Sequence, residues 1–129
     1  VDAGSYSPLV LAYIGDAVYE VMIRARVINR GSMQVNKMHK RSAMLVNAGT
    51  QAQLIRSIEE ELTPQEHAVY KRGRNAKSVT MAKHATMADD RTATGMEALV
   101  GWLFLEERFE RLAELISLGL EKIGAFEEI

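Results

Sequence analysis

Two acidic side chains stand in stretches that are otherwise almost wholly apolar, and they are the residues of this chain best suited to chemistry. Asp16 lies within residues 11–20, and Glu97 lies in a second apolar run, residues 96–105. A carboxylate buried without a positive partner is costly, so each acid is expected to have one. A hard divalent cation held between two helices would neutralise both acids at once. The alternative for Asp16 is a salt bridge to a nearby arginine.

A third acid, Glu20, lies one helical turn after Asp16. It is a candidate ligand for the same cation, but it can also reach solvent or pair with Arg24 four residues further on. The three histidines are scattered without the spacing of metal ligands, and surface or loop positions are expected for them. The sequence therefore offers carboxylates, and no histidine cluster, for metal chemistry.

The elements that must carry these acids are helices. Ser7 followed by Pro8 predicts a helix start, and Gly31 predicts a stop, so the first helix is expected to span residues 8–29. Apolar side chains occupy nearly its whole circumference. This pattern predicts a central, buried helix, with Asp16 and Glu20 directed into packed surroundings.

The rest of the chain also follows a helical pattern. Two helices are predicted between residues 33 and 62, with a break near 47–50, and a capping box at 63–66 opens a short helix that ends near Arg72 and Gly73. Thr92 or Thr94 is predicted to cap the next helix, and an amphipathic helix follows over residues 109–123. Residues 74–91 are expected to form a long loop or a loosely helical segment. The fold class is therefore all-α, in one domain over residues 1–129.

Composition narrows the class of protein. Apolar residues make up 47% of the 129 residues, which excludes disorder, and the absence of cysteine excludes disulfides and thiolate metal sites. No apolar run approaches the ~20 residues of a membrane span, and the start lacks the pattern of a signal peptide. A cytoplasmic protein without a membrane partner is expected.

The net charge of −1 conceals a strong segregation of charge. Residues 21–88 carry twelve Lys or Arg against four acids, whereas residues 89–129 carry ten acids against four Lys or Arg. The cations of the first part could form a positive surface that attracts phosphate groups. The alternative is a face that is merely solvated.

Three short motifs, in order along nearly the whole chain, resemble the ribonuclease III family. The signature helix of that family resembles residues 13–20 (YIGDAVYE), and its second acidic motif resembles residues 97–101 (EALVG). Between them lie residues 71–78 (KRGRNAKS), which together with the short length are similar to the mini-ribonuclease III branch. The resemblance implies a homodimeric helical bundle like the ribonuclease III catalytic domain, with no separate RNA-binding domain.

The resemblance also implies an active site. Asp16 and Glu97 match the family's metal-binding and catalytic acids, with Mg²⁺ as the cofactor and Mn²⁺ as a possible substitute, and Glu20 matches a further family glutamate. Larger members carry additional acids where this chain has Ala12 and Thr94. The metal site here is therefore poorer in carboxylate, so waters or phosphate oxygens are expected to complete it.

The activity implied is hydrolysis of phosphodiester bonds in double-stranded RNA. The implied substrate is the stems that flank precursor 23S ribosomal RNA, with a ribosomal protein as a candidate helper. Recognition is expected to rest on shape and phosphate contacts. The candidate RNA-binding residues are Arg72, Arg74, Asn75, Lys77, Lys37, His39, Lys40 and Arg41. The alternative for Arg72 or Arg74 is to brace the acids or to cap a helix.

Tyr13 matches the family's aromatic residue that inserts into the partner subunit, so it is the predicted dimer contact. The alternative is an ordinary core tyrosine. Two rivals to the enzyme remain at this point. One is a non-catalytic RNA-binding module that keeps the fold, as Ala12 and Thr94 suggest. The other is an all-helical dimeric interaction protein in which Asp16 and Glu97 only pair with arginines.

Overall fold

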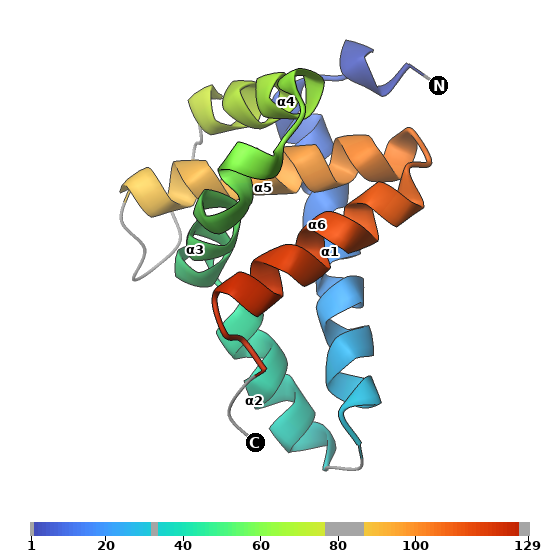
Figure 1. The fold of residues 1–129 in the computed structure, drawn as a ribbon, viewed down its shortest axis with the longest axis vertical. Coiled ribbons are helices and arrows are strands. Elements are labelled where there is room, and N and C mark those ends of the chain that lie inside the picture. The colour runs from blue at the N-terminus through green and yellow to red at the C-terminus, as the bar shows by residue number, and fades with distance from the viewer. Residues whose placement is uncertain (1, 32–33, 77–86, 127–129) are drawn as a thin grey trace.

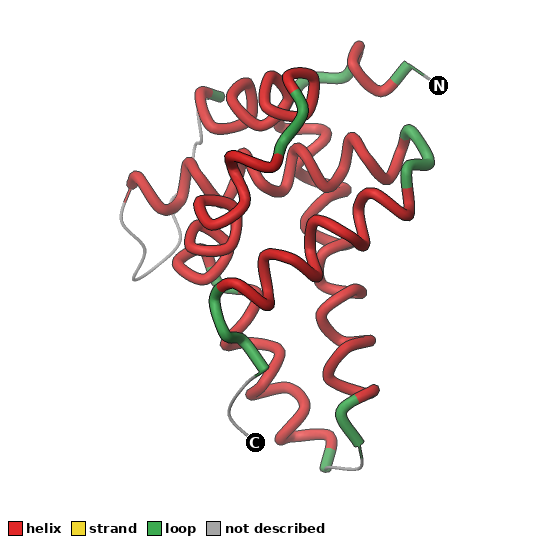
Figure 2. The backbone as a smooth tube through the Cα atoms, viewed as in Figure 1, coloured by secondary structure: helices red, strands yellow, loops and turns green. Residues whose placement is uncertain are grey.

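The described part of the chain, residues 2–31, 34–76 and 87–126 of a computed structural model, is built from helices without a strand (Figures 1 and 2). This confirms the predicted all-α class. The elements are two 3₁₀ turns, η1 (Ala3–Ser5) and η2 (Glu59–Glu61), and six α-helices: α1 (Pro8–Asn29), α2 (Val35–Val46), α3 (Ala48–Ile58), α4 (Pro64–Asn75), α5 (Met87–Leu105) and α6 (Phe109–Lys122).

The central helix is α5, and the prediction that the first helix is central was wrong. In Figure 1, α5 runs through the middle of the molecule, and α1, α3 and α4 all pack against it. Ten of its side chains or glycines are buried, including Met96 and Trp102. α1 buries only one face, and Tyr13 and Val21 on its other face are exposed. Apolar side chains all round a helix indicate that it buries apolar surface. They do not indicate which helix or subunit packs against each face.

Most helix starts were predicted correctly because their signals are local. Ser7 Oγ accepts a hydrogen bond from the Val10 amide at 3.3 Å, with Pro8 as the first helical residue of α1. Asn47 ends α2 and caps α3, where the break was expected. The predicted capping box opens α4, with both of its hydrogen bonds formed. Such caps satisfy amide groups that the first turn leaves without partners.

The start of α5 was predicted wrongly. The helix begins at Met87, so residues 87–91 are helical and Thr92 and Thr94 lie inside the helix and do not cap it. Asp89 and Asp90 in its first turn suit the positive end of the helix dipole. Arg56 of α3 also pairs with Asp89, at 3.0 Å. This tertiary contact is invisible in a local pattern. The rest of the predicted loop, residues 77–86, lies outside the described residues.

The last helix, α6, is the amphipathic cover that its pattern predicts. It buries Leu112, Leu115 and Ile116 and packs on α3 and α5. Within the described ranges, none of the helices combines the length and the hydropathy that a membrane span requires.

Candidate active site

The backbones of α1 and α5 touch where the helices cross, and two glycines permit it. A Cβ atom at Gly15 would overlap the Glu97 carbonyl oxygen, and one at Gly101 would overlap the Leu11 carbonyl oxygen. Only glycine lets two helices approach so closely. Asp16 follows one of these glycines and Glu97 lies one turn before the other, so the crossing brings the two acids together.

Asp16 and Glu97 are acids that lie close enough to interact at this crossing. Burial is the main cause that raises the pKa of Glu97 to about 9, and the hydrogen bond and negative charge of Asp16 raise it further. Glu97 is half-buried, whereas Asp16 is exposed, so the prediction that Asp16 points into packed surroundings was wrong. Among the described residues, no Lys or Arg forms an ion pair with either acid. The arginine alternative for Asp16 is therefore absent from this part of the chain.

Glu20 is half-buried, so it lies partly in packed surroundings, as predicted, and partly at the surface. Its carboxylate pairs with Arg24 at 3.1 Å, one turn along α1, which is the alternative that the sequence left open for it. Thr94 Oγ1 donates to the Asp90 carbonyl oxygen at 3.0 Å, and Ala12 is buried. The charge of Asp90 contributes to the raised pKa of Glu97.

Gln51 lies at the candidate site, and the sequence analysis did not predict it. Its side chain is 2% exposed, and its amide acts on the Glu97 carboxyl to lower the pKa of that group. No sequence signal distinguished it, because a glutamine in the first turn of a helix is ordinary. Only the packing of α3 on α5 places it beside Glu97.

The donor set fits a hard cation that keeps most of its own waters. No group of three or more His, Asp or Glu with metal-binding geometry occurs within the described residues. Two carboxylates that face each other without a positive partner nevertheless suit Mg²⁺, which commonly binds through one or two carboxylates together with waters and phosphate oxygens. Burial is the main cause that raises the pKa of Glu97, and a cation would offset both this cost and the repulsion from Asp16.

The candidate RNA-binding residues fall into two groups that the fold keeps apart. Arg72 and Asn75 are exposed near the end of α4, and Arg74 lies with its guanidinium 5.3 Å from the centre of the Tyr70 ring. The predicted contacts on α2, residues 37–41, lie toward the opposite end of the long axis of the molecule (Figure 1). Lys77 lies outside the described residues.

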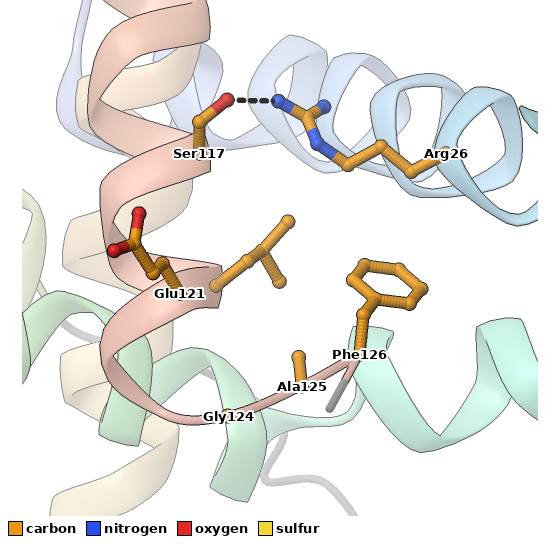
Figure 3. A pocket seen from close by; sticks show the side chains of 7 residues that line it. Arg26, Ser117, Glu121, Gly124, Ala125 and Phe126 are labelled. Atoms are coloured by element: carbon orange, nitrogen blue, oxygen red, sulfur yellow. Dashed lines mark hydrogen bonds between the residues drawn. The ribbon is translucent and has the colours of Figure 1, made fainter. Parts of the chain in front are cut away.

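Three cations of the basic region bind the C-terminal segment of the chain itself. Arg26 donates to Ser117 Oγ at 2.6 Å beside a hollow of about 280 Å³ (Figure 3). Arg30 donates to the Phe126 carbonyl oxygen at 2.8 Å, and both Arg30 and Arg41 lie over the Phe126 ring. The predicted positive surface is therefore partly used inside the fold, and none of the predicted site residues lines the hollow of Figure 3.

Tyr13 is not a core tyrosine, because 83% of it is exposed. Val10 and Val21 on the same helix are also exposed, and so are Phe104 and Phe109 where α5 leads into α6. A groove of about 380 Å³ lies beside them, lined by Ala17, Val18, Val21, Met22, Phe104, Phe109 and Leu112. Clustered exposed apolar side chains of this kind are typical of interaction sites.

Comparisons with known proteins identify the family of this chain. The Ribonuclease III domain family matches residues 9–108. The chain is 48% identical over 118 residues to the mini-ribonuclease 3 of Clostridium tetani, covering 91% of this chain and 78% of that protein. It is 44% identical over 122 residues to that of Enterococcus faecalis, covering 93% and 92%. A crystal structure of a protein from Fusobacterium nucleatum matches with a TM-score of 0.82 at 28% identity, covering 91% and 93%. The chain therefore belongs to the ribonuclease III family, in its mini-ribonuclease III branch, and is a double-strand-specific endoribonuclease.

Proposed function

We propose that Asp16 and Glu97 together hold Mg²⁺ and that the enzyme uses it to hydrolyse phosphodiester bonds in double-stranded RNA. The pairing of these acids at the glycine crossing of α1 and α5 carries the proposal. Mn²⁺, with the same preference for oxygen ligands, would substitute. When bound, the cation activates water for in-line attack on phosphorus and stabilises the charge that develops on the phosphate.

The protein's own groups supply placement and polarity. Glu97 is half-buried at the crossing and Asp16 is exposed, so Asp16 is the acid more accessible to a phosphate group. Because the raised pKa of Glu97 keeps its proton in place without a cation, metal binding must release that proton. Glu20 is assigned a structural role here, since it is already paired with Arg24.

The enzyme acts as a homodimer in this proposal, with Tyr13 in the interface. The exposed face of α1 carries Tyr13 and an apolar groove. In a symmetric dimer, the same face of a second copy would cover this apolar surface. Asp16 and Ala17 lie on this face too, so each active site would lie next to the subunit boundary. Sedimentation at micromolar concentration measures the dimer, and a clean monomer would contradict it.

The duplex is gripped through phosphate contacts in this proposal. Arg72, Arg74, Asn75 and Lys77 form the first group of contacts, and Lys37, His39, Lys40 and Arg41 form a second. The exposure of Arg72 and Asn75 supports the first group. The end of α4 that carries Arg72, Arg74 and Asn75 lies toward one end of the long axis and α2 toward the other (Figure 1), which suits a long, regular ligand such as an A-form helix.

The substrate we propose is the double-stranded stems that flank precursor 23S ribosomal RNA, with a ribosomal protein as a helper. The family membership motivates this choice. Recognition by a small surface of phosphate contacts gives modest affinity, so a helper that presents the stem would raise the yield of correct cuts. Cleavage of a transcript carrying these stems, with an unrelated duplex of equal length as control, tests it.

The deciding experiment compares the native protein with Asp16→Asn and Glu97→Gln on duplex RNA, with and without Mg²⁺. We expect cleavage only by the native protein with Mg²⁺, and a loss of roughly 1000-fold for each variant, because removing a metal ligand forfeits several kcal/mol of transition-state stabilisation. Single-stranded RNA of the same sequence is the substrate control. Variants that cut as fast as the native protein would overturn the site.

The cleavage assay also distinguishes the enzyme from the two alternative functions, an RNA-binding module and an interaction protein. A module that only binds RNA would retain the duplex without cutting it, and an interaction protein would fail to bind duplex at low salt. Family membership as an endoribonuclease favours neither, and the acid pair is not joined to arginines within the described residues, as the interaction protein would require.

A further inference from the structure

Gln51 carries a buried hydrogen-bond donor without a full partner. Its side chain is 2% exposed, and in the described part of the chain its Nε2 is the one buried side-chain nitrogen or oxygen that lacks a hydrogen bond of normal distance and angle. A buried donor left in this state is costly. A group of this kind in a native structure calls for an explanation, and a catalytic role or a missing partner are two of the recognised ones.

The position of this donor points to the acid pair. The Gln51 amide lies close enough to act on the Glu97 carboxyl, without the geometry of a full hydrogen bond. α3 brings it there because that helix packs along α5. The donor is therefore a buried group beside the Glu97 carboxyl, whereas Asp16 is exposed.

The backbone that carries Gln51 is firmly held. Asn47 caps this turn by accepting from the Thr50 amide at 2.9 Å, and Thr50 Oγ1 donates back to the Met44 carbonyl oxygen at 2.8 Å. Further along α3, Arg56 pairs with Asp89 of α5. A side chain on so rigid a support can set the orientation of a ligand carboxylate.

We propose that Gln51 is a positioning residue of the active site: its side-chain amide donates a hydrogen bond to the Glu97 carboxylate when that carboxylate serves as a metal ligand, and so holds Glu97 toward Asp16. The inference rests on the proposed function, because it assumes that Glu97 binds the cation. Ligand carboxylates are commonly held by such hydrogen bonds, and losing one typically costs 10- to 100-fold in metal affinity or activity.

The test replaces the amide by a side chain of similar shape without a donor, Gln51→Met. The matched control is Gln53→Met, at an exposed position on the same helix. Mn²⁺ affinity is measured by calorimetry on the protein without RNA. The rate of cleavage of a short RNA duplex and the KM for that duplex are measured with Mg²⁺, well below the unfolding midpoint.

We expect Gln51→Met to bind Mn²⁺ about tenfold more weakly and to cut at least tenfold more slowly, with an unchanged KM for RNA. Its unfolding midpoint should be unchanged or higher, since a buried donor without a full partner has been removed. Gln53→Met should match the native protein. A purely structural role for Gln51 would instead lower the midpoint and leave metal affinity and cleavage rate intact.

Native affinity or a native cleavage rate in Gln51→Met overturns the role of Gln51. If this variant does not fold, Gln51→Asn, whose shorter side chain withdraws the amide from Glu97, takes its place under the same criteria. Asp16→Asn in the same assay distinguishes a failure of the proposed metal site from a failure of the proposed role of Gln51. Cleavage by Asp16→Asn at the native rate contradicts the proposed site, whereas an inactive Asp16→Asn beside a native-like Gln51 variant contradicts the role of Gln51 alone.

Discussion

Glu66 and Glu97 are both acids enclosed by helices, yet their surroundings are opposite. Glu66, which is 1% exposed, receives two hydrogen bonds from Arg111, at 2.8 and 2.9 Å, and one from the Thr63 amide. Burial acts to raise the pKa of Glu66, but these bonds outweigh it and hold that pKa below its ordinary value. Glu97 faces another acid, and its pKa is raised to about 9.

The contrast separates a structural acid from the acid that we propose to bind the cation. The Glu66 carboxylate is paired with Arg111 and joins α4 to α6, whereas burial and then the neighbouring Asp16 raise the pKa of Glu97. A strongly perturbed acid with a like-charged neighbour at an open site is typical of a functional centre. Burial alone therefore does not identify an active-site acid; its partners do.

The largest effect is expected from moving the two site acids apart. Gly15→Ala or Gly101→Ala inserts a methyl group into a backbone contact, so we expect a loss of at least about 3 kcal/mol in the free energy of unfolding. Cleavage should fall with it even in the folded protein. Gly49→Ala, where a Cβ would meet only ordinary contacts, is the control. Urea titration and cleavage below the midpoint measure both effects, and an active Gly15→Ala would show that the crossing is not required.

Removing the structural acid should destabilise the protein without touching its chemistry. Glu66→Gln leaves the Arg111 guanidinium without its main charge partner, and breaking a buried ion pair in this way costs about 3 kcal/mol. Cleavage well below the midpoint should stay at the native rate. Thermal unfolding and the cleavage assay together check this. Slow cleavage by the folded variant would remove the distinction between the two acids.

The two acids should also give opposite dependences on pH. The pKa of Glu97 lies near 9 in the fold against 4.5 when unperturbed, so the stability it contributes to the metal-free protein is full below pH 4.5 and is lost as the pH rises toward 9. Glu97→Gln should therefore unfold roughly 5 °C higher than the native protein at pH 8. The lowered pKa of Glu66 has the opposite sign: its contribution is present above the ordinary pKa and is lost as the pH falls.

Scanning calorimetry across this pH range, with chelator present, measures how the unfolding midpoint of each protein depends on pH. Glu66→Gln should flatten the acid side of the stability curve, and Glu97→Gln the neutral to alkaline side. An unfolding midpoint for Glu97→Gln that tracks the native protein at every pH would show that the carboxyl is not perturbed.

The smallest effect is expected at the surface. Arg72→Ala should weaken binding of duplex RNA only a few-fold. It should also reduce the magnitude of the slope of log K against the logarithm of the salt concentration by about one. Arg30→Ala is the control, because that guanidinium is already held at the Phe126 carbonyl oxygen. Binding in Ca²⁺ over a series of salt concentrations measures the slope. Equal slopes for Arg72→Ala and the native protein would remove Arg72 from the interface.

The sequence by itself determined the features that depend on near neighbours. The starts of α1, α3 and α4 follow from Ser7, Asn47 and Thr63, whose side chains bond amides three residues away. The all-α class follows from periodicity, because one helical turn is set by neighbouring residues. The apolar context of Asp16 and Glu97 marks both acids as candidates, and the resemblance of their motifs to the ribonuclease III family implies their role.

Only the tertiary structure decided what covers each face. It made α5 the central helix, left Asp16 and Tyr13 exposed, and placed Arg56 against the first turn of α5. It also placed Gln51 of α3 beside Glu97 of α5, a contact that the spacing of residues along the chain does not predict. The physical reason is that burial and charge pairing depend on which helices are in contact. Here Gly15 and Gly101 determine how closely α1 and α5 approach each other.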